Sequence, residues 1–287
     1  MMQAEDSIAR RLGYGPDARL IIINCDDLGS SHSANLASLE AMEKGVATSG
    51  TLMVPCPWAR EAVELFKGKD VGVHLTLTAE YPTYRWRSLT GAKSLHDDQG
   101  YLPRTVDEAR ARARVEDVRA ECRAQIHQAY DWGVDVTHLD SHMGTVQLDP
   151  RFFDVYLELA EEFRLPLRMV SAPAEPVLGF ESRAPARARG LVFADEVWAQ
   201  WGRPTGEQIR SVFPKLRPGT VAEFLVHPVF DGPELRGYDL TEAQIRVDDH
   251  ACAMDPEVKA LIAAERLVPI SYRPLRELQR RGALARA

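Results

Sequence analysis

The stretch LIIINCDDLG, residues 20–29, indicates the fold class of this chain. The run LIIIN at residues 20–24 is almost entirely apolar, which is typical of a parallel strand covered on both faces. Two aspartates, Asp26 and Asp27, follow it directly, and residues 34–44 then place leucines and a methionine at helical intervals. The stretch therefore predicts a buried strand, a polar turn and a helix, in the order of a β/α unit.

The same alternation of short apolar runs and helical patterns continues along most of the chain. Further strands are predicted at residues 51–54, 71–77, 134–139, 167–170, 221–226 and 267–272. Helices are predicted at residues 106–132 and after Asp149-Pro150, which supply an N-cap and a first-turn proline. We therefore predict an α/β fold, a distorted (β/α) barrel of about seven parallel strands, rather than an open sheet.

The domain organisation follows from the absence of a linker in the sequence. No stretch rich in Pro, Gly and Ser divides the chain, so residues 1–287 are predicted to form a single domain. Residues 171–218 are rich in Pro, Ala and Arg and show no readable pattern. Residues 231–254 are predicted to be a long loop or an insertion.

The composition of the 287 residues narrows the classes of function. The net charge is −7, without the clustered Lys and Arg that nucleic-acid phosphates select. No apolar run is long enough to span a bilayer. Residues 1–6 lack the basic and then apolar pattern of a signal peptide, and the four cysteines are scattered. We therefore expect a cytoplasmic protein with reduced thiols and no nucleic-acid or membrane partner, and we leave a homo-oligomer open.

Ionisable side chains gather where the predicted strands end. These residues, all at or near the carboxyl end of a predicted strand, are Asp26, Asp27, His74, His138, Asp140, His142 and His227. Because the carboxyl ends of parallel strands meet at one edge of a barrel or open sheet, we expect their side chains to lie close together. Four separate strand ends that each deliver such groups favour a functional site.

Each of these features also has a structural explanation. The pair Asp26-Asp27 fits a turn or a helix N-cap, and a lone His74 is more often a hydrogen-bonded histidine within a strand. His227-Pro228 is a weak signal by itself. The run HLDSH at residues 138–142 is harder to explain structurally, since three buried ionisable groups need mutual partners or a metal.

The residue types predict a particular chemistry. One carboxylate with two imidazoles suits zinc or another divalent first-row metal and leaves positions open for water and substrate. A second carboxylate can take a proton from the attacking water, and a histidine across the site can protonate a leaving amine. Neither a phosphate-binding glycine loop nor a G-x-S-x-G elbow is present. The sequence therefore indicates metal-assisted hydrolysis of an amide.

Several segments resemble, in order and spacing, the YdjC/ChbG-type carbohydrate deacetylases. These segments are NCDDLG at 24–29, VATS at 46–49 with LMV at 52–54, GVHLTLT at 72–78, and THLDSH at 137–142. The resemblance covers residues 18–170 well and resumes at LVHP, residues 225–228, and near residues 271–273. It implies a seven-stranded barrel-like fold and removal of acetyl from N-acetylglucosamine units, so the expected partner is a small N-acyl sugar or oligosaccharide.

The resemblance also implies roles for individual residues. Asp26 takes the place of the general base and His227 that of the general acid. The implied ligands of one divalent metal ion, zinc or magnesium, are Asp27, His74 and His142. Arg168 matches a position where the family tends to carry arginine, and we predict that it orients Asp26 at the substrate-binding site.

This sequence departs from the family pattern after the last metal motif and in the segment that follows His74. Family members commonly carry further histidines after Asp-Ser-His, whereas MGTV stands here at residues 143–146. The segment YPTYRW at residues 81–86 ends in Trp86, which we predict to bind the sugar; packing of this aromatic loop on the barrel rim is the alternative. Two other functions remain open: hydrolysis of another amide, such as a small cyclic amide or a formylated sugar, and non-catalytic carbohydrate binding.

Overall fold

The computed structural model describes residues 7–198 and 201–284. Residues 1–6, on which the expected location rested, lie outside this description. The strands are β1 (Leu20–Leu28), β2 (Ser49–Leu52), β3 (Val71–Leu75), β4 (Leu139–Ser141), β5 (Glu196–Trp198), β6 (Val221–Val226) and β7 (Val268–Pro269). The α-helices are α1 (Ile8–Arg11), α2 (His32–Glu43), α3 (Ala59–Leu65), α4 (Val106–Arg112), α5 (Val115–Asp131), α6 (Pro150–Glu162), α7 (Arg183–Ala188), α8 (Thr205–Val212), α9 (Pro233–Tyr238), α10 (Ala243–Met254), α11 (Pro256–Ala264) and α12 (Arg273–Leu284).

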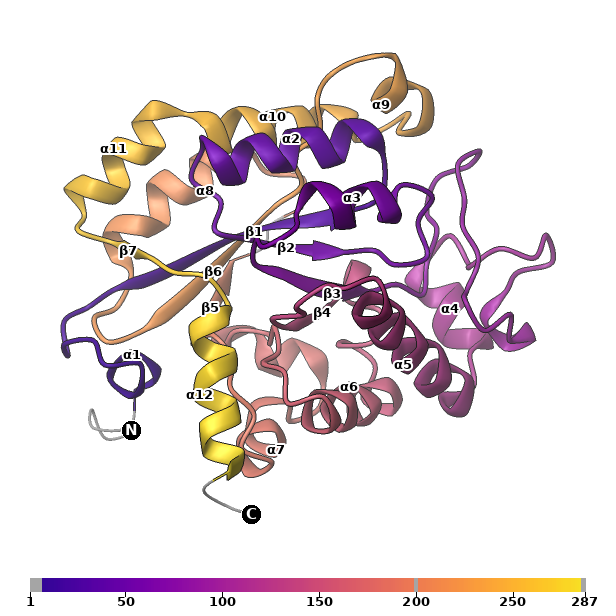
Figure 1. Ribbon diagram of the computed structural model, residues 1–287, viewed down its shortest axis with the longest axis horizontal. Helices are drawn as coiled ribbons and strands as arrows, with labels where there is room; N and C mark the ends of the chain where they lie inside the picture. Colours follow the sequence, from indigo (N-terminus) through magenta and orange to yellow (C-terminus); the bar gives the residue numbers. More distant parts are fainter. Residues whose placement is uncertain (1–6, 199–200, 285–287) are drawn as a thin grey trace.

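The seven strands form one curled parallel sheet. Its order is β4-β3-β2-β1-β6-β5, and β7 pairs with the first residues of β1. Single bridges from Leu139 to Leu167 and from Leu167 to Phe193 link β4 to the chain that enters β5. In the view of Figure 1, helices α2, α8, α10 and α11 lie above the strands and α5, α6, α7 and α12 below them. The prediction of a distorted (β/α) barrel is confirmed, with part of the barrel reduced to single bridges.

Strand β1 lies at the centre of this architecture, and every residue of it is buried. Its alternate side chains pack into two separate apolar clusters. Ile21 and Ile23 belong to the main core, whereas Leu20 and Ile22 pack with Tyr272 and other residues near the C-terminus. Burial on both faces explains why the sequence of β1 is continuously apolar rather than alternating.

Two predicted elements in the first half differ from the structure. The helix predicted at residues 106–132 is interrupted, because Ala113 has extended backbone (φ −68°, ψ 131°) and the Arg114 amide donates a hydrogen bond to Ser94 Oγ. The strand predicted at 134–139 is regular only from Leu139 onward, as β4. The apolar run therefore located the strand but not its start.

The second half of the chain differs more from the predicted elements. Residues 231–254, predicted to be a long loop or an insertion, contain the helices α9 and α10, and the unreadable stretch 171–218 contains α7, β5 and α8. The strand predicted at 167–170 is reduced to one bridged residue, Leu167, which pairs with Leu139 and Phe193. In α10 the polar Arg246 and Asp249 are buried, so this helix lacks the apolar stripe by which amphipathic helices are recognised.

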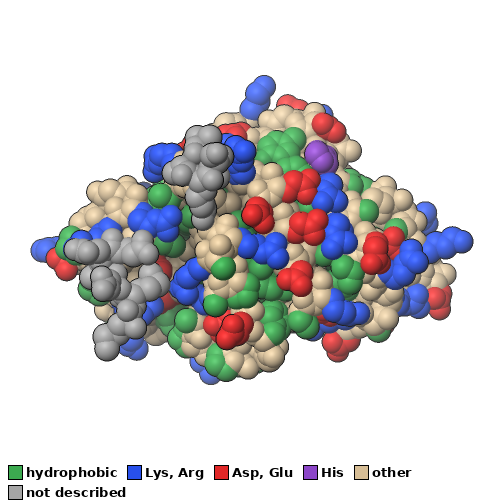
Figure 2. Space-filling view, turned by 90° about the horizontal axis from the view of Figure 1, so that it is seen from below, with side chains coloured by type: hydrophobic (Ala, Val, Ile, Leu, Met, Phe, Trp, Pro, Cys, Tyr) green, Lys and Arg blue, Asp and Glu red, His purple; other side chains and the backbone are tan. Residues whose placement is uncertain are grey.

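The face seen in Figure 2 carries Lys and Arg interspersed with Asp and Glu, rather than a cluster of one sign. Ion pairs between α5 and α6 are of this mixed type: Arg119 lies 3.0 Å from Glu158, and Arg123 lies 2.8 Å from Glu162. Such exposed pairs contribute little to stability. Among the described residues, no helix combines the length and the apolar character that crossing a bilayer requires.

Candidate metal centre

Three side chains from different strands converge on one buried point. Asp27 lies near the end of β1, His74 lies in β3 and His142 follows β4. His74 Nε2 and His142 Nδ1 lie 3.3 Å and 3.2 Å from Asp27 Oδ1, and all three side chains are at most 5% exposed. Asp27 Oδ1 nevertheless accepts no hydrogen bond. A buried carboxylate oxygen without a hydrogen bond, faced by two imidazole nitrogens, fits a three-donor metal site.

The backbone of β1 explains how two consecutive aspartates reach the same cavity. In a regular strand, neighbouring side chains point to opposite faces. The pairing of β1 with β2 shifts register between Cys25 and Leu28, and Asp27 lies in the left-handed region at φ 65°. This irregularity turns Asp26 and Asp27 toward one cavity, which both of them line. Strained backbone of this kind in a non-glycine residue is concentrated at functional sites.

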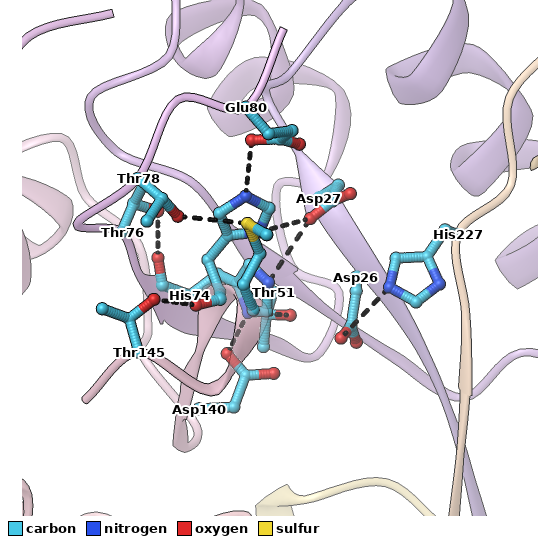
Figure 3. A network of polar contacts seen from close by, with 12 residues as sticks. Asp26, Asp27, Thr51, His74, Thr76, Thr78, Glu80, Asp140, Thr145 and His227 are labelled. Atoms are coloured by element: carbon cyan, nitrogen blue, oxygen red, sulfur yellow. Dashed lines mark hydrogen bonds and ion pairs between the residues drawn. The ribbon is translucent and has the colours of Figure 1, made fainter. Parts of the chain in front are cut away.

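Each imidazole of the site has a second carboxylate on its outer nitrogen. His74 Nδ1 is hydrogen-bonded to Asp140 Oδ1, and His142 Nε2 lies 3.0 Å from Glu80 Oε2 (Figure 3). Such partners fix the ring orientation and leave the inner nitrogen for the metal. Burial alone would lower the pKa of both imidazoles. The neighbouring carboxylates outweigh it and raise the pKa of His74 to about 10 and that of His142 to about 9.

Asp26 is held by an arginine from the opposite side of the barrel. Arg168 donates to both oxygens of Asp26, at 2.7 Å and 2.8 Å, and also to Glu223 at 2.8 Å. Burial would raise the pKa of Asp26, but the charge of Arg168 outweighs it and holds that pKa well below its ordinary range. The structure thus pairs Arg168 with Asp26 in the geometry that an orienting role requires.

His227 follows β6 and lies on the other side of Asp26 from the metal donors (Figure 3). Its Nε2 is 3.7 Å from Asp26 Oδ2, and its Nδ1 is 3.4 Å from Asp249 Oδ2. The Asp249 carboxylate also accepts the backbone N–H of His227 at 2.7 Å. Asp249 therefore fixes the ring of His227, with Nε2 directed toward Asp26.

Two residues of α10 belong to the site although the sequence gave no reason to select them. Asp249 supports His227, and Arg246 donates to Asp27 Oδ2 at 2.7 Å and to Asp239 at 3.1 Å. By binding Oδ2, Arg246 leaves the Oδ1 atom of Asp27 to the two imidazoles. Both residues come from the segment that was predicted to be a loop, where no motif marks them.

Two side chains that the sequence analysis selected, those of His138 and Trp86, lie away from the metal donors. His138 stacks on Tyr272 with ring centroids 3.6 Å apart, beside Gly72, where a Cβ atom would approach its Nδ1 to 2.5 Å. Trp86 is only 3% exposed and donates its indole N–H to the carbonyl of Thr78. Trp86 therefore packs within its loop, as the alternative stated, and Tyr81 is the aromatic residue of that loop that lines the cavity.

The site opens into a cavity of about 670 Å³. Its lining combines the metal donors with the second carboxylate and the acid candidate, in particular Asp26, Asp27, His74, His142, Arg168 and His227. The remaining lining comes largely from the loops after β4 and β5 and from α8 and α10. A cavity of this size accommodates a small molecule rather than a macromolecular surface.

Fold and site together define a class: a (β/α)-barrel protein with a buried carboxylate–imidazole cluster, suited to a divalent metal, at the carboxyl edge of its sheet. The model of the YdjC-like protein family matches residues 20–264. The chain therefore belongs to the YdjC-like family, as its sequence motifs predicted.

Relatives with assigned names agree with this membership. A carbohydrate deacetylase of Geobacillus stearothermophilus is 33% identical over 91% of this chain and 99% of that protein. A carbohydrate deacetylase of Thermus thermophilus is 43% identical, in a match that spans 55% of this chain and 56% of that protein. Among solved structures, a protein of Enterococcus faecalis described as a cellobiose-phosphate cleavage protein superposes with a TM-score of 0.79 at 25% identity, covering 90% of this chain and 99% of that one.

Proposed function

We propose that this chain is a metal-dependent deacetylase that removes an N-acyl group, acetyl foremost, from an amino sugar or oligosaccharide. The observation that carries the proposal is the convergence of Asp27, His74 and His142, with Asp26 and His227 beside them in one cavity. The relatives named carbohydrate deacetylase support the class of substrate.

Asp27, His74 and His142 would hold one divalent metal ion. Two imidazole donors favour zinc or a similar first-row metal over magnesium, which prefers oxygen ligands. When bound, such an ion would polarise an amide carbonyl and lower the pKa of water toward about 7.

Asp26 is placed to accept the proton of the attacking water. Arg168 keeps its carboxylate ionised and fixes its direction through two hydrogen bonds. Because the pKa of Asp26 lies well below its ordinary range, the carboxylate is a weak base. Proton transfer to Asp26 would therefore need a water of lowered pKa, which is the chemistry that an ion held by Asp27, His74 and His142 would supply.

His227 is placed to protonate the leaving amine. An amine leaves poorly unless its nitrogen gains a proton as the carbon–nitrogen bond breaks. The contact of Nδ1 with Asp249 fixes the ring and directs Nε2 toward the cavity. The candidate base and acid thus lie side by side, 3.7 Å apart, and line the same cavity as the metal donors.

A substrate screen tests this proposal. Purified protein, loaded in turn with zinc, cobalt, manganese and magnesium, is assayed for release of free amine from N-acetylated sugars and oligosaccharides, formylated sugars and small cyclic amides. We expect turnover of N-acetyl sugars, lowered by roughly 10²–10⁴-fold in Asp26→Asn under the same conditions. Turnover of cyclic amides alone would contradict the proposed substrate, and binding of sugars without any turnover would contradict the proposed catalysis.

A further inference from the structure

The mouth of the cavity carries an unusual concentration of exposed apolar side chains. Over residues 7–198 and 201–282, six large apolar side chains are exposed: Trp58, Leu89, Met143, Val177, Trp201 and Leu240. Three of them line this cavity, Met143 at 44%, Val177 at 88% and Trp201 at 47% exposure. We call these three the apolar rim. Single exposed apolar residues are ordinary, but a group that borders a cavity marks a binding surface.

The three residues of the rim come from separate segments. Met143 follows the metal donor His142, Val177 lies in the 3-10 turn at Ala172–Leu178, and Trp201 lies between β5 and α8. Met143 lies in the left-handed region at φ 50°, and the Thr78 hydroxyl donates to its sulfur at 3.4 Å. The thioether is therefore held at the mouth although its backbone conformation is costly for a residue with a side chain.

Two polar groups near the rim are already engaged by the protein. Ser171 Oγ donates to the Val197 carbonyl at 2.8 Å and accepts the Val197 N–H at 2.6 Å. The Trp201 indole N–H donates to Glu242 at 2.8 Å, and its ring lies against Arg246 and His227, while 47% of the side chain stays exposed for contact. Sugar hydroxyls need hydrogen-bond partners when they are enclosed, whereas a hydrocarbon group needs only apolar surface.

We propose that the substrate is amphiphilic: an N-acyl amino sugar that carries an alkyl or aryl group, which lies against Met143, Val177 and Trp201. This inference rests on the proposed function and specifies its substrate class. The amide lies between the metal donors and His227, while the hydrocarbon group extends to the mouth. The group is either the aglycone of the sugar or a long N-acyl chain, and the two have the same recognition chemistry.

Two series of substrates distinguish an aglycone from a long N-acyl chain as the hydrocarbon group. One keeps the N-acetyl group and extends the aglycone of an N-acetylglucosaminide from methyl to octyl. The other keeps a methyl glycoside and extends the N-acyl chain from acetyl to octanoyl. Burying one methylene group improves binding by up to about fourfold. We therefore expect kcat/KM to rise along one series, by at least about a hundredfold in total, and to change little along the other.

Two substitutions test whether the gain in kcat/KM with chain length depends on the apolar rim. Val177→Asp places a charge on a side chain that is 88% exposed, so the fold tolerates it, and the gain with chain length should disappear. Leu240→Asp is the matched control, since Leu240 is 67% exposed and does not line the cavity; the gain should persist. A gain that survives in Val177→Asp, or flat profiles in both series, would overturn the inference.

Binding measured by calorimetry separates this inference from the proposed function. The Asp26→Asn variant leaves N-acyl substrates intact, so dissociation constants can be compared along both series. If affinity rises with chain length while the wild type turns over no member of either series, the amphiphilic ligand is supported and the deacetylase proposal fails. If turnover proceeds with affinities independent of chain length, the deacetylase proposal stands and this inference fails.

Discussion

The cavity has two unlike sides. On the metal side, Asp27, His74 and His142 are buried, and their outer atoms are paired with Arg246, Asp140 and Glu80. The apolar rim is exposed and has few polar partners. Chemistry at a metal requires donors fixed in orientation. Recognition of a hydrocarbon group requires only apolar surface, because the hydrophobic effect is non-directional. In our proposal the metal side determines the reaction and the apolar rim determines the substrate, so variants of the two sides should differ in kind.

Removal of the metal should have the largest effect, and it should be confined to the metal side. Dialysis against a chelator is expected to lower turnover by about a thousandfold or more, since Lewis-acid stabilisation is worth several kcal/mol. Adding back zinc should restore it. Affinity of Val177→Asp and the wild type for a long-chain ligand should still differ in the metal-free protein. Full turnover after verified metal loss would contradict the assigned chemistry.

Asp26→Asn is expected to lower turnover by roughly 10²–10⁴-fold with the metal retained. The amide keeps the shape of the carboxylate but cannot accept the proton. Arg168 would keep Glu223 and Asp140 as partners, at 2.8 Å each, so the variant should fold. Turnover and metal content are measured on the same sample. A loss below about tenfold would argue against the base.

His227→Ala should affect turnover of substrates with an amine and with a phenolate leaving group differently. Turnover of an N-acyl substrate is expected to fall by roughly 10²–10⁴-fold, because the amine needs a proton. A small phenyl ester should be cleaved nearly as well as by the wild type, because a phenolate leaves without such help. If His227 only supports its loop, both activities should fall by similar factors and the melting temperature should drop.

Glu80→Gln should have the smallest effect on the metal side. Glu80 contacts the outer nitrogen of His142 at 3.0 Å, and loss of such a partner typically weakens metal binding by about 10–100-fold. The chain offers a matched control in Glu61→Gln, which alters a carboxylate 2.8 Å from His32 Nδ1, outside the cavity. Competition with a chelating dye measures the metal affinity of both variants. Equal metal affinities would contradict a role of Glu80 in holding the metal.

The same contrast explains how much the sequence predicts. The metal side follows from short motifs placed at the ends of β1, β3, β4 and β6, because parallel strands bring their carboxyl ends together. The identity of the fold and the neighbourhood of Asp26, Asp27, His74, His142 and His227 are therefore readable from strand patterns and from resemblance.

The rest of the site depends on long-range contacts without a local pattern. Arg246 reaches Asp27 across 219 positions of sequence, and Asp249 reaches His227 from a helix that has no apolar stripe. Trp86 is the opposite case, because the sequence analysis selected it for the site although it packs elsewhere. An aromatic residue in the loop after β3 is compatible with both sugar binding and core packing. Only the tertiary arrangement shows that it packs.

The central claim is that Asp27, His74 and His142 hold one metal ion, and counting metal in paired histidine variants tests it most directly. His138 and His142 are both buried and four residues apart, but only His142 faces Asp27. Elemental analysis after zinc loading and gel filtration should find about one metal per chain in the wild type and in His138→Ala, and almost none in His142→Ala, where two protein donors remain. Metal retained in His142→Ala but lost in His138→Ala would contradict the account.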